Sequence, residues 1–222
     1  YFHPREIDAG REIMTQWIRR VSRAVKESGA NRELLVRVPA DVDACHSIGL
    51  DVRRWIDEEL VDIVAGETLG GPELLDQTSN LRPLVEAAEG KPARVHAALH
   101  SLVDSDRLHT ATNEMLRAAA SNYWAQGVDG LYLAYWFNYW PYKAPFYEIL
   151  REAPHPDIMA PKDKTYFVPT MTGRYPKLRL EPGLRMQLPA GLDLDQPVKI
   201  DLPVSDDLRR WERSGRVHQV LL

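Results

Sequence analysis

Short apolar segments alternate with amphipathic segments four times along this chain, and this alternation limits the possible folds more than any other feature. The apolar segments are predicted strands at residues 34–38, 61–65, 93–99 and 130–137. Their starts lie 27, 32 and 37 residues apart, which leaves room for a helix after each strand. Strands that alternate with helices in this way are typical of a parallel sheet, so the sequence predicts an α/β fold.

The number of these units suggests a particular architecture. A complete (β/α)₈ barrel needs about 250 residues, and four units fill about half of it. The chain also begins without Met, and a helix precedes the first strand. We therefore interpret residues 1–163 as the C-terminal half of a (β/α)₈ TIM barrel, with a flavodoxin-like sheet as the alternative. A proline-rich linker and alternating apolar segments follow, so residues 164–222 are expected to be an incomplete β-rich domain, the start of a β-sandwich.

Composition excludes several classes of partner. The net charge is −4 and no basic stripe occurs, which argues against a nucleic-acid partner. No segment approaches the ~20 apolar residues of a membrane span, so no membrane partner is expected. The single Cys45 excludes an internal disulfide and a multi-cysteine metal site. Because no strong metal motif occurs and no glycine-rich phosphate loop follows the third or fourth strand, we expect neither a metal nor a cofactor.

Candidate functional residues lie at the carboxyl ends of the predicted strands, where α/β folds place their chemistry. Glu67 ends the second strand, before a long loop. A carboxylate there can serve as general acid, base or nucleophile, or it can form a structural salt bridge. Arg37 interrupts an otherwise apolar strand. Inside a barrel its guanidinium needs a carboxylate partner or an anionic ligand, so an ion pair and a substrate clamp are both open.

The third predicted strand contributes two histidines. Val95, Ala97 and Leu99 alternate with polar residues, so this apolar set is expected to face the helices. His96 and His100 have the opposite parity and are expected to face the interior, with His100 near the carboxyl end. They lie about 13 Å apart on a strand and therefore do not form a chelating pair. Each is either a functional group or an ordinary hydrogen-bonded histidine.

An unusually dense aromatic run overlaps and follows the fourth predicted strand. It comprises Tyr132, Tyr135, Trp136, Phe137, Asn138, Tyr139, Trp140 and Tyr142. Aromatic faces at a strand end can stack against sugar rings, and an amide can bond sugar hydroxyls. The alternative is a hydrophobic plug that closes the barrel or packs against the second domain.

Several segments together resemble the bacterial proteins related to family 10-like glycoside hydrolases, which are TIM barrels with a C-terminal β-rich domain. These segments are Arg37-Val38-Pro39, Gly49-Leu50-Asp51-Val52 with Trp55, residues 61–64, residues 127–133, and the tail from Leu188-Pro189 through residues 203–207. The resemblance implies hydrolysis of a glycosidic bond by two carboxylates. A non-catalytic carbohydrate-binding barrel is the alternative.

The resemblance also assigns roles within this chain. Glu67 is the expected catalytic carboxylate, and its partner is expected upstream of Tyr1. The residues expected to bind the carbohydrate are Arg37, His96, His100, Tyr135, Trp136, Asn138 and Trp140.

Overall fold

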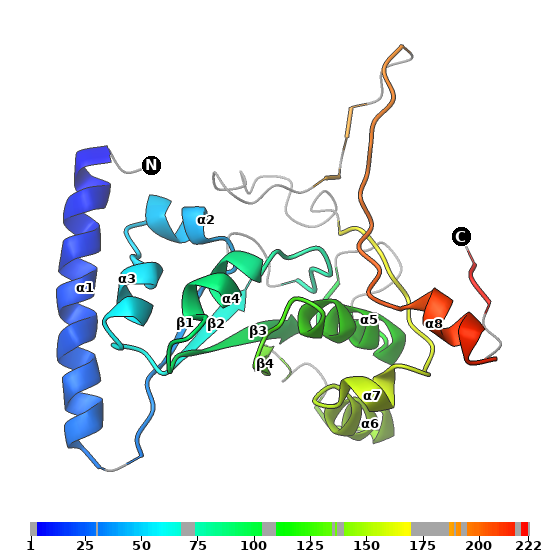
Figure 1. The fold of residues 1–222 in the computed structure, drawn as a ribbon, viewed down its shortest axis with the longest axis horizontal. Coiled ribbons are helices and arrows are strands. Elements are labelled where there is room, and N and C mark those ends of the chain that lie inside the picture. Colours follow the sequence, from blue (N-terminus) through cyan, green and yellow to red (C-terminus); the bar gives the residue numbers. More distant parts are fainter. Residues whose placement is uncertain are drawn as a thin grey trace.

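The chain forms a parallel sheet with helices between its strands (Figure 1). The structure, a computed structural model, describes residues 4–29, 31–67, 74–103, 110–134, 136, 140–169, 187–188, 190–191, 195–215 and 219–221. The strands are β1 (Leu35–Pro39), β2 (Ile63–Glu67), β3 (Arg94–His100) and β4 (Gly130–Ala134). The helices are α1 (Pro4–Glu27), α2 (Val42–Ser47), α3 (Val52–Asp57), α4 (Arg82–Ala88), α5 (Asn113–Trp124), α6 (Ala144–Glu152), α7 (Pro156–Met159) and α8 (Leu208–Arg213).

The four strands lie in sequence order and every neighbouring pair is parallel, as the βα spacing predicts. The register places Arg37 beside Ala65 and Ala65 beside His96. His96 in turn lies beside Gly130 of β4. The fold is therefore mixed α/β with a four-stranded parallel sheet. The fourth strand is described from Gly130 to Ala134; residues 135 and 137 of the expected strand lie outside the described residues, and Trp136 is not in a strand.

One face of the sheet packs into the main hydrophobic core. Val38, Val64 and Leu99, which share one parity, are buried in the same cluster as helix residues such as Trp55 and Leu116. The predicted parity of Val95, Ala97 and Leu99 is thus confirmed. Because consecutive right-handed crossovers in one direction place their helices on one side of a sheet, the opposite face keeps its polar side chains.

Side-chain caps define where several helices begin. Asp41 accepts from the backbone N–H groups of Asp43 and Ala44 at the start of α2. Asp51 caps α3 by accepting from the Arg54 N–H, and Thr112 caps α5 by accepting from the Met115 N–H. The residue at the N-cap position of α4 is Leu81, which makes no side-chain cap bond. Asn80, one residue earlier, accepts from the Arg82 N–H over 3.3 Å, whereas the Ser79 hydroxyl donates to the Asp76 carboxylate.

The long helix α1 lies against α3, at the edge of the molecule away from α5 (Figure 1). Inside this contact the Trp55 indole N–H donates to the Thr15 hydroxyl over 2.9 Å. Toward solvent, Arg19 forms two hydrogen bonds of 2.7 Å to the Glu58 carboxylate. Among the described helices, none combines the length and the apolar character needed to cross a membrane.

Beyond residue 163 the described chain departs from the all-β expectation. Its one named element in that region is helix α8, which Asp207 caps by accepting from the Arg210 N–H. The alternating segments expected to be strands are residues 177–180, 184–188, 198–202 and 217–221. Residues 198–202 belong to no sheet among the described residues, and the other three segments lie wholly or partly outside the described residues. Asn122 of α5 holds this region by donating to the Pro203 carbonyl and accepting from the Ser205 N–H.

Candidate functional site

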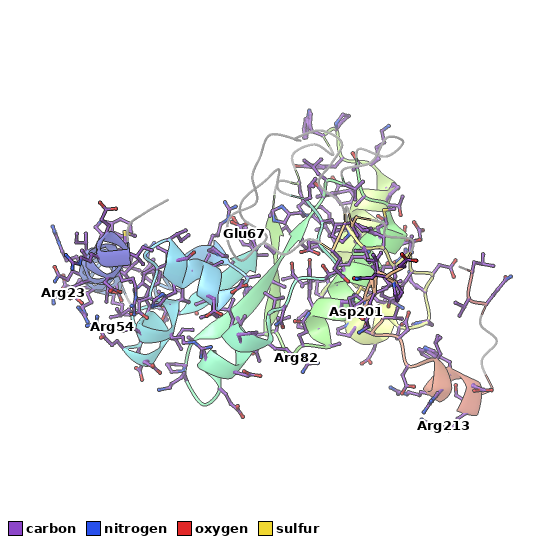
Figure 2. All side chains as sticks on the ribbon, turned by 90° about the horizontal axis from the view of Figure 1, so that it is seen from above. Arg23, Arg54, Glu67, Arg82, Asp201 and Arg213 are labelled. Carbon is purple, nitrogen blue, oxygen red and sulfur yellow. The ribbon has the colours of Figure 1, made fainter. Side chains whose placement is uncertain are left out.

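The sheet face opposite the main core carries the candidate site. Arg37, Glu67, His100 and Tyr132 share the parity opposite to that of the core residues, and each comes from a different strand. Arg37, Glu67 and His100 were expected to meet at the carboxyl edge of the sheet, and the contacts below bring them together. Figure 2 labels Glu67 at this end of the sheet.

An ion pair between Arg37 and Glu67 is the centre of the site. Nη2 of Arg37 lies 2.7 Å from Oε1 and 2.8 Å from Oε2 of Glu67. The Glu67 side chain is 1% exposed, whereas Arg37 keeps 33% of its side chain open to solvent. The guanidinium thus covers the carboxylate from the solvent side. A guanidinium neighbour favours the charged form of a carboxyl group, which suits a nucleophile or an electrostatic role.

His100 lies beside this ion pair as a neutral side chain. Its Nε2 is 3.6 Å from Oε2 of Glu67, and the imidazole is 1% exposed. Burial, followed by the positive charge of Arg37, lowers the pKa of His100 to about 4. Although the distance would allow a salt bridge, the imidazole is uncharged at neutral pH, so the contact adds no charge to the site. A neutral imidazole can donate or accept one proton at each ring nitrogen.

His96 lies four residues before His100 on the same face of β3 and packs over Gly130. A Cβ added at Gly130 would lie 2.7–3.0 Å from three atoms of the imidazole ring, so a side chain there would force the His96 ring to move. Burial, with a smaller contribution from Arg94, lowers the pKa of His96. Both predicted histidines therefore face the side that their parity indicated, and both are biased toward the neutral form.

Tyr132 completes the face and was not among the predicted site residues. The guanidinium carbon of Arg37 lies 5.5 Å from the centre of the Tyr132 ring, within the range of a cation–π contact. The ring thus holds Arg37 from the side away from β1. The sequence did contain a signal for this placement: Tyr132 has the same parity on β4 as Gly130 and Ala134, which pair with His96 and His100.

The predicted aromatic platform divides into a buried part and an exposed part. Trp136 is buried: its indole N–H donates to the Leu99 carbonyl over 2.7 Å, and its ring meets Phe146 edge to face. The structure therefore places Trp136 in the core and not on the polar face. Trp140 is 75% exposed and meets Tyr142 edge to face. Tyr135 and Asn138, both predicted to contact carbohydrate, lie outside the described residues.

The four strands hold few groups for acid–base or metal chemistry. Glu67 is the one Asp or Glu within the four strands. Across the described part of the chain, no group of three or more His, Cys, Asp or Glu side chains could hold a metal ion. Cys45 is buried and donates to the Pro39 carbonyl, and burial raises the pKa of its thiol to about 12, so it is a packing residue.

Comparison with known proteins adds no assignment to this geometry. No model of a known protein family matches the chain, and no curated protein is significantly similar to it.

Proposed function

We propose that this chain is part of a glycoside-hydrolase-like barrel protein that binds a carbohydrate on the polar face of the sheet, with Glu67 as one of two carboxylates that cleave a glycosidic bond. The observation that carries the proposal is the convergence of Arg37, Glu67 and His100 on one face at the carboxyl ends of β1, β2 and β3. Guanidinium, carboxylate and neutral imidazole groups together offer both donors and acceptors to sugar hydroxyls.

The contact between Arg37 and Tyr132 supports a curved, barrel-type sheet. Arg37 is on β1 and Tyr132 is on β4, so two strands lie between them. In a flat sheet three strand spacings are about 14 Å, and both side chains would have to lie almost parallel to the sheet to meet. A sheet that is concave on its polar face brings the two side chains together more easily. Sequential parallel order and helices on one face are also the features of a singly wound barrel.

A non-catalytic carbohydrate-binding protein is the second candidate. The environment of Glu67 favours this candidate, because its carboxylate is paired with Arg37 and is almost fully buried. Two-carboxylate hydrolysis needs a second carboxyl group about 5–10 Å away, and the four strands provide no other. In this candidate the ion pair fixes the shape of the face, and Arg37 and Tyr132 contact the sugar.

Binding and turnover measurements on the same protein separate these candidates. The whole barrel protein that contains this chain would be tested by calorimetry against a panel of neutral and acidic oligosaccharides, and against aryl glycosides for turnover. We expect binding to at least one carbohydrate, and we expect Arg37→Ala to weaken it at least about tenfold, the loss of one charge-assisted hydrogen bond.

The variant Glu67→Gln decides between hydrolysis and binding alone. If Glu67 is a catalytic carboxylate, the variant loses turnover by several orders of magnitude while it still binds sugar. If the protein only binds, wild type shows no turnover and Glu67→Gln changes affinity alone. A chain that neither binds any carbohydrate of the panel nor hydrolyses any aryl glycoside would refute both candidates. Arg94→Ala, at the opposite end of β3, serves as the matched control.

A further inference from the structure

The extended segment between Pro197 and Pro203 has the properties of an unpaired edge strand. It stands away from the sheet and the helices as the long orange segment in Figure 1. Val198, Ile200 and Leu202 alternate with charged residues, and each of the three keeps 42–43% of its surface exposed. Figure 2 shows that Asp201, in this segment, is well separated from Glu67. The segment is therefore independent of the polar face.

One edge of this segment is already occupied. The side-chain amide of Gln187 donates to the Asp201 carbonyl over 2.7 Å and accepts from the Asp201 N–H over 2.5 Å. In an extended chain the N–H and C=O groups of alternate residues point to opposite edges. Those of Val198, Ile200 and Leu202 therefore point away from Gln187. They form no hydrogen bond to any residue that the structure describes.

The sequence of this segment is complementary to itself. If two copies pair antiparallel with Ile200 opposite Ile200, then Val198 lies opposite Leu202. Lys199 of each copy then lies opposite Asp201 of the other copy, and Pro197 lies opposite Pro203. The free edge belongs to Ile200 and its even-numbered neighbours, so these residues form the hydrogen-bonded pairs. Lys199 and Asp201 fall in the non-hydrogen-bonded pairs, where side chains come closest.

We propose that residues 198–202 are a homotypic docking strand, through which two copies of this chain pair as an antiparallel, two-fold symmetric ribbon. Charge complementarity selects this occupant: Lys199 and Asp201 are 84% and 70% exposed and form an ion pair of 2.9 Å within one chain. In the dimer, Lys199 of each copy also lies opposite Asp201 of the other copy, so two further ion pairs form between the copies. Pro197 and Pro203 lie opposite each other at non-hydrogen-bonded positions, so their missing N–H groups remove no bond from the ribbon.

The association is weak and depends on concentration. A two-stranded ribbon on its own is marginally stable, and five residues per copy bury less than a stable interface of about 1,600 Å². Six backbone hydrogen bonds and the shared apolar face of Val198, Ile200 and Leu202 provide the attraction. Analytical ultracentrifugation from micromolar to millimolar protein would therefore show a monomer–dimer equilibrium.

Two charge variants test the register directly. Lys199→Asp makes both positions acidic, and Asp201→Lys makes both positions basic, so each variant alone places like charges opposite each other. We expect each variant to weaken its own dimerisation by about tenfold or more. An equimolar mixture of the two variants restores association, because every acidic position then faces a basic one. The ion pair within each chain is broken in both variants, so only pairing between chains explains the recovery.

Further variants distinguish pairing through residues 198–202 from self-association through another surface. Lys91 and Asp57 form an exposed ion pair of 3.1 Å elsewhere on the molecule, and Lys91→Asp mixed with Asp57→Lys should behave like wild type. Ile200→Pro removes one N–H of the free edge and should abolish dimerisation without changing the thermal unfolding of the sheet. A chain that stays monomeric throughout would overturn the proposal, as would dimerisation that the charge variants leave unchanged. Capture of a different partner strand, with no homodimer, would overturn it as well.

Discussion

At the scale of single residues, His100 links the candidate site to the stability of the fold. Burial and Arg37 lower its folded-state pKa to about 4, from 6.5 in an exposed chain. Between these two values the unfolded chain binds a proton that the folded chain does not. The free energy of unfolding therefore falls as the pH decreases from 6.5 to 4, by a total of about 3 kcal/mol from this group.

The variant His100→Gln isolates this contribution. Urea unfolding at a series of pH values should show that the difference in unfolding free energy between wild type and variant shrinks by about 3 kcal/mol between pH 7 and pH 4. His46→Gln, the same substitution at an exposed histidine, provides the control for the change of side chain itself. A constant difference between wild type and His100→Gln across the whole pH range would contradict the burial of a neutral imidazole.

Side-chain parity could be predicted from the sequence, but side-chain partners could not. Alternation alone placed His96 and His100 on the polar face, since a strand has only two faces. The pairing of Arg37 with Glu67 depends on strand register and on the reach of one long side chain, which no local pattern encodes. Trp136 was misplaced because an aromatic residue at a strand end suits a core as well as a binding surface.

At the scale of elements, Asp51 joins two helices that are far apart in the sequence. Its Oδ1 accepts from the Arg54 N–H and caps α3, while its Oδ2 accepts from Nη2 of Arg11 in α1 over 2.6 Å. Asp51→Ala removes both interactions, and we expect it to lower the unfolding free energy by about 1–2 kcal/mol.

The variant Asp51→Asn separates the two roles, because asparagine caps helices as well as aspartate does but carries no charge. Urea unfolding should give Asp51→Asn a loss of less than about 1 kcal/mol, the value of an exposed ion pair. Equal losses for the asparagine and alanine variants would show that the cap contributes nothing.

The strands were the most predictable elements, because each is a short apolar run next to polar residues. Helix α8 was missed, since the alternation of Val198, Ile200 and Leu202 suggested that strands continued to the end of the chain. The signal that was overlooked is Asp207, which caps a run of good helix formers. The alternation itself was real, but these residues are extended without a sheet to join.

At the scale of the whole molecule, side-chain amides attach the C-terminal region to the α/β part of the chain. Gln77 bonds to the backbone of Thr165 and Phe167. Lys164 and Tyr166 both bond to the Asp206 carboxylate. Asn122 is the central contact, because it reaches both the Gln77 carbonyl and the extended segment. The C-terminal region is therefore held by polar contacts to a few residues, whereas the sheet is held by its apolar core.

This arrangement predicts that the C-terminal segment can be released without unfolding the sheet. Asn122→Ala leaves the Pro203 carbonyl and the Ser205 N–H without their amide partner. Because each of these two lost hydrogen bonds costs about 1 kcal/mol, local opening should become about thirtyfold more frequent. Trypsin should then cleave after Lys199 about thirtyfold faster in dilute protein, while the melting temperature of the sheet changes little. Gln126→Ala is the matched control. Gln126 lies just beyond the end of α5, and its side chain bonds to the backbone of Ser79, Leu81 and Asn122 but not to the C-terminal segment. If both variants accelerated cleavage equally, general loosening of α5 and not the Asn122 contact would control the segment.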